Sequence, residues 1–157
     1  MSGEYFKLAL LGALGILLVI ACVTDLRSRI ISNRLNLCIA ALAPLWWLAS
    51  GLDPWPGMAM QLALALAVFV AFAALFAIGC MGGGDVKLLG ALALWFPWGP
   101  MLSMLMLMAL MGGVVTIVTV VHHRMTRTLG QPQIPYGIAI SFAALWLIGE
   151  RYLNHFA

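Results

Sequence analysis

Long uncharged apolar runs are the feature that most limits how this chain can fold. Residues 8–24, 57–79 and 101–121 contain no Asp, Glu, Lys or Arg. Each run is close to the roughly 20 residues that a helix needs to cross a hydrocarbon core of about 30 Å. Because the backbone polar groups of a spanning segment must be satisfied internally, we expect these runs to be membrane-spanning helices.

The composition of the whole chain supports this interpretation. Hydrophobic residues make up 64% and charged residues 8% of the 157, against about 45–50% and 25% in soluble domains. Further spans are expected at residues 35–52, 88–96 and 136–152, where Pro135 is well placed to begin the last helix. Residues 88–96 are few, and would cross only as a helix that starts near Asp85. We therefore predict an all-α polytopic bundle of about six transmembrane helices, forming one membrane-embedded domain over residues 1–157.

The basic residues predict how the bundle is oriented. Six of the eight follow the first, third and fifth spans, and two lie on the opposite side. The first group comprises Arg27, Arg29, Arg34, Lys87, Arg124 and Arg127, and the second Lys7 and Arg151. The positive-inside rule places the first group in the cytoplasm and both termini outside. The net charge of +3 is better explained by topology than by a nucleic-acid partner.

Cysteine and histidine residues give no indication of a metal or cofactor. Cys22, Cys38 and Cys80 stand singly, without a CxxC or Cys/His group. We interpret them as small apolar residues. His122 and His123 have no acid or cysteine near them in sequence, and solvated interfacial positions are expected for both.

Residues 82–87, Gly-Gly-Gly-Asp-Val-Lys, put a carboxylate between two apolar runs. A charge in a membrane costs about 2.5–3.5 kcal/mol on insertion scales, so Asp85 is a candidate functional residue. Glycines without a Cβ can let another chain approach closely. The alternative is a tight turn with a solvated Asp at a helix N-terminus, where negative charge is favourable.

The order of the spans relates Asp85 to a second acid. Asp25 follows the first span and Asp85 follows the third, so both are expected at the same membrane face, with Asp53 at the other. Two carboxylates within hydrogen-bond distance share one proton, which supplies a base and an acid together. In aspartic proteases such a pair activates water without a metal, serine or cysteine. The sequence predicts a shared face and leaves contact between the two acids open.

Three segments carry a resemblance to a known family. Residues 82–85 fit the GxGD signature of polytopic aspartic peptidases. Asp25, the arginines after it and residues 31–33, Ile-Ser-Asn, resemble the first catalytic motif of the type IV prepilin peptidases. Residues 135–137, Pro-Tyr-Gly, resemble a later Pro-x-Gly segment of that family. The resemblance covers essentially the whole chain, in span order as well as in motifs.

This resemblance implies an endopeptidase of the cell inner membrane. Its substrate would be a prepilin or pseudopilin with a short basic leader and a hydrophobic helix, cut at the cytoplasmic face among membrane lipids. Asp25 and Asp85 would be the catalytic pair, and Gly82 and Gly84 would let the substrate backbone approach.

Two residues near this pair leave alternatives open. Lys87 would tune Asp85 or anchor its loop. Asn33 would bind substrate or cap a helix, and we expect the cap.

The sequence departs from the family pattern at two points. Ser32 stands where the family usually has proline, which would loosen the turn without changing the carboxylate. No loop is long enough for the cytoplasmic domain that larger members carry. The chain therefore resembles the short type that serves tight-adherence (Flp) pili, which implies no N-methyltransferase activity.

Two other classes compete with a peptidase. Carboxylates beside broken helices also mark ion pathways in small transporters. A transporter would place them near the midplane, whereas these acids neighbour basic helix ends. An assembly or scaffold protein would not need the aspartates.

Overall fold

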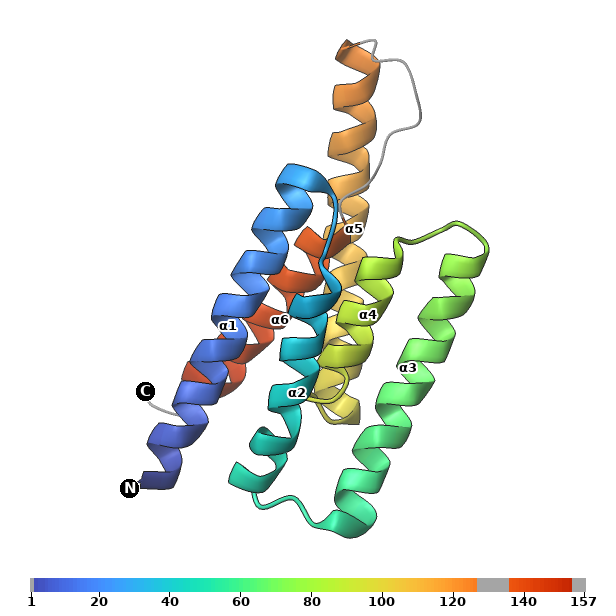
Figure 1. Cartoon of the computed structure of the whole chain (residues 1–157). Coiled ribbons are helices and arrows are strands. Elements are labelled where there is room, and N and C mark those ends of the chain that lie inside the picture. The colour runs from blue at the N-terminus through green and yellow to red at the C-terminus, as the bar shows by residue number, and fades with distance from the viewer. Residues whose placement is uncertain (1, 127–135, 154–157) are drawn as a thin grey trace.

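The computed structural model describes residues 2–126 and 136–153, and these fold into α-helices joined by short connections. Their bounds are α1 Ser2–Ser28, α2 Asn33–Ala49, α3 Ala59–Ala77, α4 Gly83–Leu92, α5 Trp98–Thr126 and α6 Tyr136–Leu153. A π-helical turn, η1 Pro54–Met58, leads into α3. No strand occurs within these two ranges, so the predicted all-α class is confirmed (Figure 1).

Within the described residues, three helical segments are long and apolar enough to cross a membrane. They are Gly3–Ser28, Pro54–Ala77 and Trp98–Val121. Large apolar side chains on all three are exposed, among them Ile16, Leu66 and Leu110. Such surfaces suit lipid, and the chain is a polytopic membrane protein.

The fourth expected span, residues 88–96, is not a crossing helix. Helix α4 begins earlier, at Gly83, and ends at Leu92 after ten residues. At 1.5 Å per residue it is about 15 Å long, half of the hydrocarbon thickness. It packs against α2, α3 and α6, and in Figure 1 it lies between α2 and α3. Leu88, Leu89 and Leu92 are fully enclosed, which explains why this short apolar run stays inside the protein.

A helix that ends inside the bundle needs partners for its last carbonyl groups. Gln61 Nε2 donates to the carbonyl oxygens of Ala93, at 2.7 Å, and Phe96, at 2.8 Å. Trp47 Nε1 donates to Leu94 O at 2.7 Å. Gln61 is the only strongly polar residue of its apolar run, and these bonds are the physical reason for its presence.

The remaining helices complete the core around α4. Helix α6 packs against α5, α1 and α4, and α1 also packs against α2. The connection from α1 to α2 lies at the same end of the bundle as the start of α4 (Figure 1). Pro135, expected to begin the last helix, lies outside the described residues.

Candidate active site

Asp25 lies in the last turn of α1 and is buried, with 5% of its surface exposed. The expected span ended at this residue, but the helix continues to Ser28. The backbone oxygen of Asp25 accepts a 2.9 Å hydrogen bond from the N–H of Arg29, which has a left-handed φ of +55°. This conformation ends the helix and starts the turn toward α2.

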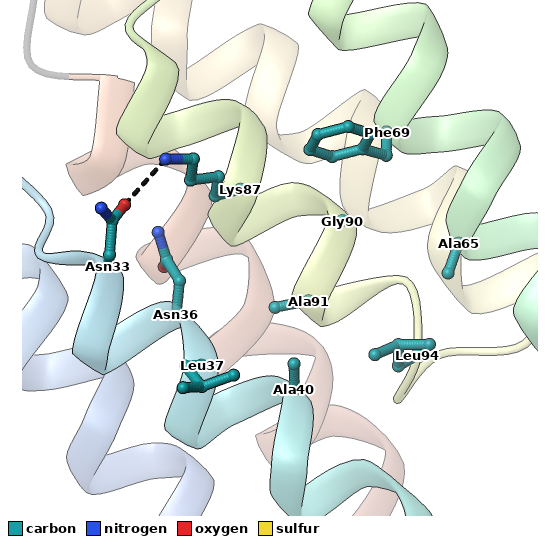
Figure 2. Close-up of a pocket in the computed structure, with 10 residues that line it drawn as sticks. All are labelled: Asn33, Asn36, Leu37, Ala40, Ala65, Phe69, Lys87, Gly90, Ala91 and Leu94. Atoms are coloured by element: carbon teal, nitrogen blue, oxygen red, sulfur yellow. Dashed lines mark hydrogen bonds between the residues drawn. The ribbon is translucent and has the colours of Figure 1, made fainter.

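The turn leads into an N-cap provided by Ser32. Ser32 Oγ accepts a 3.3 Å hydrogen bond from Leu35 N, and α2 begins at Asn33. The cap expected at Asn33 is therefore wrong. Asn33 Oδ1 instead accepts a 2.8 Å bond from Lys87 Nζ, which joins α2 to α4 (Figure 2). Two roles were considered for Lys87, tuning Asp85 and anchoring its loop. The contact with Asn33 is of the anchoring kind.

Asp85 is the third residue of α4, and only 7% of its surface is exposed. Gly82 is the N-cap residue of the helix, and its backbone N–H donates to the Asp85 carboxylate. An acid at the third position that reaches back to the N-cap N–H is half of a capping box. Of the alternative considered for this stretch, the position at a helix N-terminus is present, whereas the acid is buried and not solvated. A Cβ on Gly82 would lie 2.9 Å from Asp85 Oδ2, which explains a small residue there.

Gly137, at the start of α6, contacts the other carboxylate. The backbone N–H groups of Gly137 and Ile138 donate to the Asp25 carboxylate, while its Oδ2 atom has no hydrogen-bond partner. A Cβ on Gly137 would lie 2.7 Å from this Oδ2 and 2.8 Å from Ile31 Cδ1. The sequence indicated Gly137 only as part of the Pro-x-Gly resemblance, without its contact to Asp25.

Ile31 connects the surroundings of the two acids. This buried side chain from the α1–α2 turn contacts Gly137 at the start of α6. A Cβ on Gly84 would lie 3.2 Å from both Ile31 Cβ and Ile31 O, so Ile31 also contacts the start of α4. The close neighbour of Gly84 is therefore part of the same chain. The approach of a substrate backbone at Gly82 and Gly84 stays a prediction.

The pKa of Asp85 depends on the groups around this carboxyl. Asp85 lies on α4, which is outside the three segments that can cross the membrane. Burial is the main cause that raises the pKa of Asp85 to about 7, and the nearby charge of Asp25 adds to it. The N–H of Gly82 acts in the opposite direction on this pKa. The charge of Asp25 thus acts on Asp85, a point that the order of the spans had left open. Such a pair can hold one proton near neutral pH and offer a base beside an acid.

An open groove of about 470 Å³ lies beside this site, between α2, α3 and α4 (Figure 2). Its polar end is formed by Asn33, Asn36 and Lys87, and the rest of its lining is apolar. Asn36 links the groove to the candidate site, because its Nδ2 donates a 3.1 Å bond to Gly84 O. The lining suits an apolar chain, such as a lipid tail or a hydrophobic helix. The apolar part consists of Leu37, Ala40, Ala65, Phe69, Gly90, Ala91 and Leu94.

Other predicted residues lie elsewhere. Asp53 is exposed in the connection after α2, at the opposite end of that helix from Asn33. Cys22, Cys38 and Cys80 are free thiols. In the part of the chain that the structure describes, no group of three or more His, Cys, Asp or Glu residues could hold a metal ion. The side chains of His122 and His123 lie outside the described ones.

Comparison with known protein families places the chain among peptidases. The model of the type IV leader peptidase family matches residues 12–117, more than half of the chain. The matched range contains both Asp25 and Asp85 and ends before Gly137. No curated protein and no solved structure matches the chain.

Proposed function

Because the chain belongs to the type IV leader peptidase family, we propose that it is an aspartic endopeptidase in which Asp25 and Asp85 activate water. One observation carries the proposal. Two buried carboxylates lie in the last turn of α1 and the first turn of α4, and the charge of Asp25 contributes to the raised pKa of Asp85. Family membership supports a prepilin leader peptidase role.

The chemistry follows from the shared proton. The ionised carboxylate takes a proton from water as the water oxygen attacks the scissile carbonyl. The protonated partner donates a hydrogen bond to the carbonyl oxygen and later supplies the proton of the leaving amine. With the pKa of Asp85 at about 7, proton transfer in both directions is accessible near neutral pH.

The substrate and the membrane side belong to the same proposal. The substrate is a prepilin or pseudopilin whose short basic leader lies in the cytoplasm and precedes a hydrophobic helix. Cleavage takes place at the cytoplasmic face of the inner membrane, and the excess of basic residues after the first, third and fifth apolar runs supports this face. Both termini are then outside. The enzyme serves tight-adherence (Flp) pili or a similar system, and it cleaves without N-methylation.

A transporter is the competing function. Its acids would be expected near the middle of the membrane. Asp25 lies in the last turn of a 27-residue helix, and Asp85 in the first turn of α4. Positions at helix ends favour an interfacial hydrolase.

The deciding experiment is cleavage by the purified protein in lipid nanodiscs. A candidate prepilin is added, and the new N-terminus of the product is determined by mass spectrometry. A single cut before the hydrophobic helix is the expected result. The proposal fails if the intact protein leaves every prepilin uncut, or if Asp25→Asn and Asp85→Asn proteins cut as well as the parent.

A further inference from the structure

Asn36 is a buried amide, the fourth residue of α2, with 5% of its surface exposed. Its Nδ2 donates to Gly84 O at 3.1 Å, while its Oδ1 is buried without a hydrogen-bond partner. The carbonyl of Gly84 can only accept, so the amide must present its NH₂ group there, and its oxygen faces away. A buried acceptor without a partner costs free energy. Retaining this amide therefore needs a reason other than stability.

The bonded carbonyl belongs to the peptide unit that joins Gly84 to Asp85. Three consecutive glycines precede Asp85. Glycine allows more backbone conformations than any other residue, so this segment is not fixed by its own sequence. Within it, Asp85 N donates to Gly82 O at 3.1 Å, which is a local bond of the same turn. The Asn36 bond comes from another helix, and it fixes the plane of the peptide relative to α2.

We propose that Asn36 is a positioning residue that holds the Gly84–Asp85 peptide so that the Asp85 carboxylate faces Asp25. This inference rests on the proposed function. Asn36 acts through the backbone, since its amide bonds Gly84 rather than either carboxylate. Ile31 supports the same glycine through packing, and Asn36 adds the directional contact.

Replacement by leucine separates positioning from stability. Leucine has a similar size, and it removes both the bond to Gly84 and the unpaired Oδ1. Gly84 lies within α4, so its carbonyl keeps the intrahelical bond from the N–H four residues later, unlike the carbonyls of Ala93 and Phe96 beyond the helix end. Removing an unsatisfied polar atom then offsets the loss of the Asn36 bond, and the Asn36→Leu protein should unfold at the same temperature as the parent or higher. Its kcat should fall about tenfold, which is the effect of one misplaced hydrogen-bonded group on the transition state. Asn36 also lines the open groove, so KM is measured separately, and a change confined to KM would contradict a positioning role.

The experiment measures kcat, KM and thermal unfolding for the parent and for Asn36→Leu, Gln61→Leu and Asp85→Asn proteins in the same nanodiscs. Gln61→Leu is the matched control, because it also replaces a buried amide that bonds backbone carbonyls of the α4 region. Its unfolding temperature should fall together with its activity. An Asn36→Leu protein that loses stability and kcat in parallel, or that fails to accumulate, would overturn the positioning role.

The Asp85→Asn protein distinguishes this inference from the proposed function. If Asp85→Asn is inactive and Asn36→Leu keeps full kcat, the inference about Asn36 alone is wrong. If Asp85→Asn is fully active, the dyad is wrong, and the role of Asn36 is overturned with it.

Discussion

The two ends of α4 differ in how their buried polar groups are paired. At its C-terminal end, Gln61 and Trp47 donate to three backbone carbonyls that lie inside the bundle. At its N-terminal end lie a buried carboxylate, Asp85, and an amide, Asn36, whose oxygen has no partner. Asp25 Oδ2, a carboxylate oxygen that also has no partner, belongs to the last turn of α1, the helix that leads to this same end of the bundle (Figure 1).

This difference separates a structural end of the helix from a functional one. Polar groups of native proteins are normally paired when buried, and exceptions call for an explanation. Sequences usually satisfy local rules everywhere except at functional sites. Among the described residues, two of the three buried side-chain atoms without a partner, Asp25 Oδ2 and Asn36 Oδ1, belong to residues of the candidate site, and the third, Ser141 Oγ, lies on α6. The first two support the candidate site independently of any motif. The following predictions test whether the two ends differ as described.

The largest expected effect is the loss of cleavage when either acid is neutralised. Asp25→Asn and Asp85→Asn should each lower kcat by about 10³-fold or more, because the base or the acid of the pair is removed. Both proteins should stay folded, since asparagine has nearly the same shape. Initial rates of prepilin cleavage measure this effect. Asp53→Asn, at an exposed acid outside the site, is the control and should keep the parent rate.

A methyl group at Gly137 should have the next largest effect. In a Gly137→Ala protein the added Cβ would meet Asp25 Oδ2 at 2.7 Å, so the carboxylate must move. A shift of about 1 Å can cost about 10²-fold in rate, and we expect kcat to fall by that order. Gly113→Ala on α5, where nothing lies within 4 Å, is the matched control. Equal rates for the two variants would mean that Gly137 does not hold Asp25 in place.

At the structural end of α4, Gln61→Leu should act on stability. The change leaves the carbonyls of Ala93 and Phe96 without their donor. Each buried carbonyl without a hydrogen-bond donor costs about 1–3 kcal/mol, so the free energy of unfolding should fall by about 2 kcal/mol or more. Denaturation in mixed detergent micelles measures it. An unfolding free energy equal to that of the parent would erase the distinction between the two ends.

Only the functional end of α4 carries an acid, so pH should act there. The pKa of Asp85 is raised to about 7, which means that the proton is held below pH 7 and lost above it. Activity should therefore decrease as pH rises through about 7, by up to about tenfold per unit, because the pair loses its acid. The pH dependence of kcat measures this. A rate that still increases above pH 8 would contradict a required proton on the pair.

Asp25→Asn should also change the acid that it leaves behind. Removing the charge of Asp25 removes one of the causes that raise the pKa of Asp85. That pKa should therefore decrease, and the infrared band of the protonated carboxyl should disappear at a lower pH than in the parent. An unchanged titration would mean that the two acids do not interact.

Much of this arrangement could be predicted from the sequence, for physical reasons. Apolar runs indicate helices because lipid leaves the backbone no other solution. Counting spans between Asp25 and Asp85 predicts a shared end, since each crossing reverses direction. The length of α4 could not be predicted, because Leu88, Leu89 and Leu92 would suit either lipid or a protein core. Whether this run crosses the membrane or ends inside the protein depends on Gln61 and Trp47, which are distant in sequence and donate to the carbonyls after α4.

The residues around the two acids were less predictable, because their roles depend on contacts between distant segments. Gly137 lies more than one hundred positions after Asp25, and nothing local shows that its missing Cβ leaves room for that carboxylate. The amide of Asn36 reaches Gly84 across 48 positions, from another helix. Ser32 and Asn33 are neighbours with similar capping ability, and only the backbone of the turn decides between them.

Ser32 should show the smallest effect, because its cap lies outside both ends of α4. Ser32→Ala removes the bond to Leu35 N and should cost about 1 kcal/mol of unfolding free energy. Ser32→Pro loses the same bond, but proline fixes φ near the −69° already present and restricts the unfolded chain. The two contributions should cancel to within about 0.5 kcal/mol. Thermal unfolding of both variants tests this, with Ser50→Ala at the other end of α2 as the control. If Ser32→Pro is the less stable of the two, the turn does not accept the proline ring, and the gain expected from a fixed backbone is wrong.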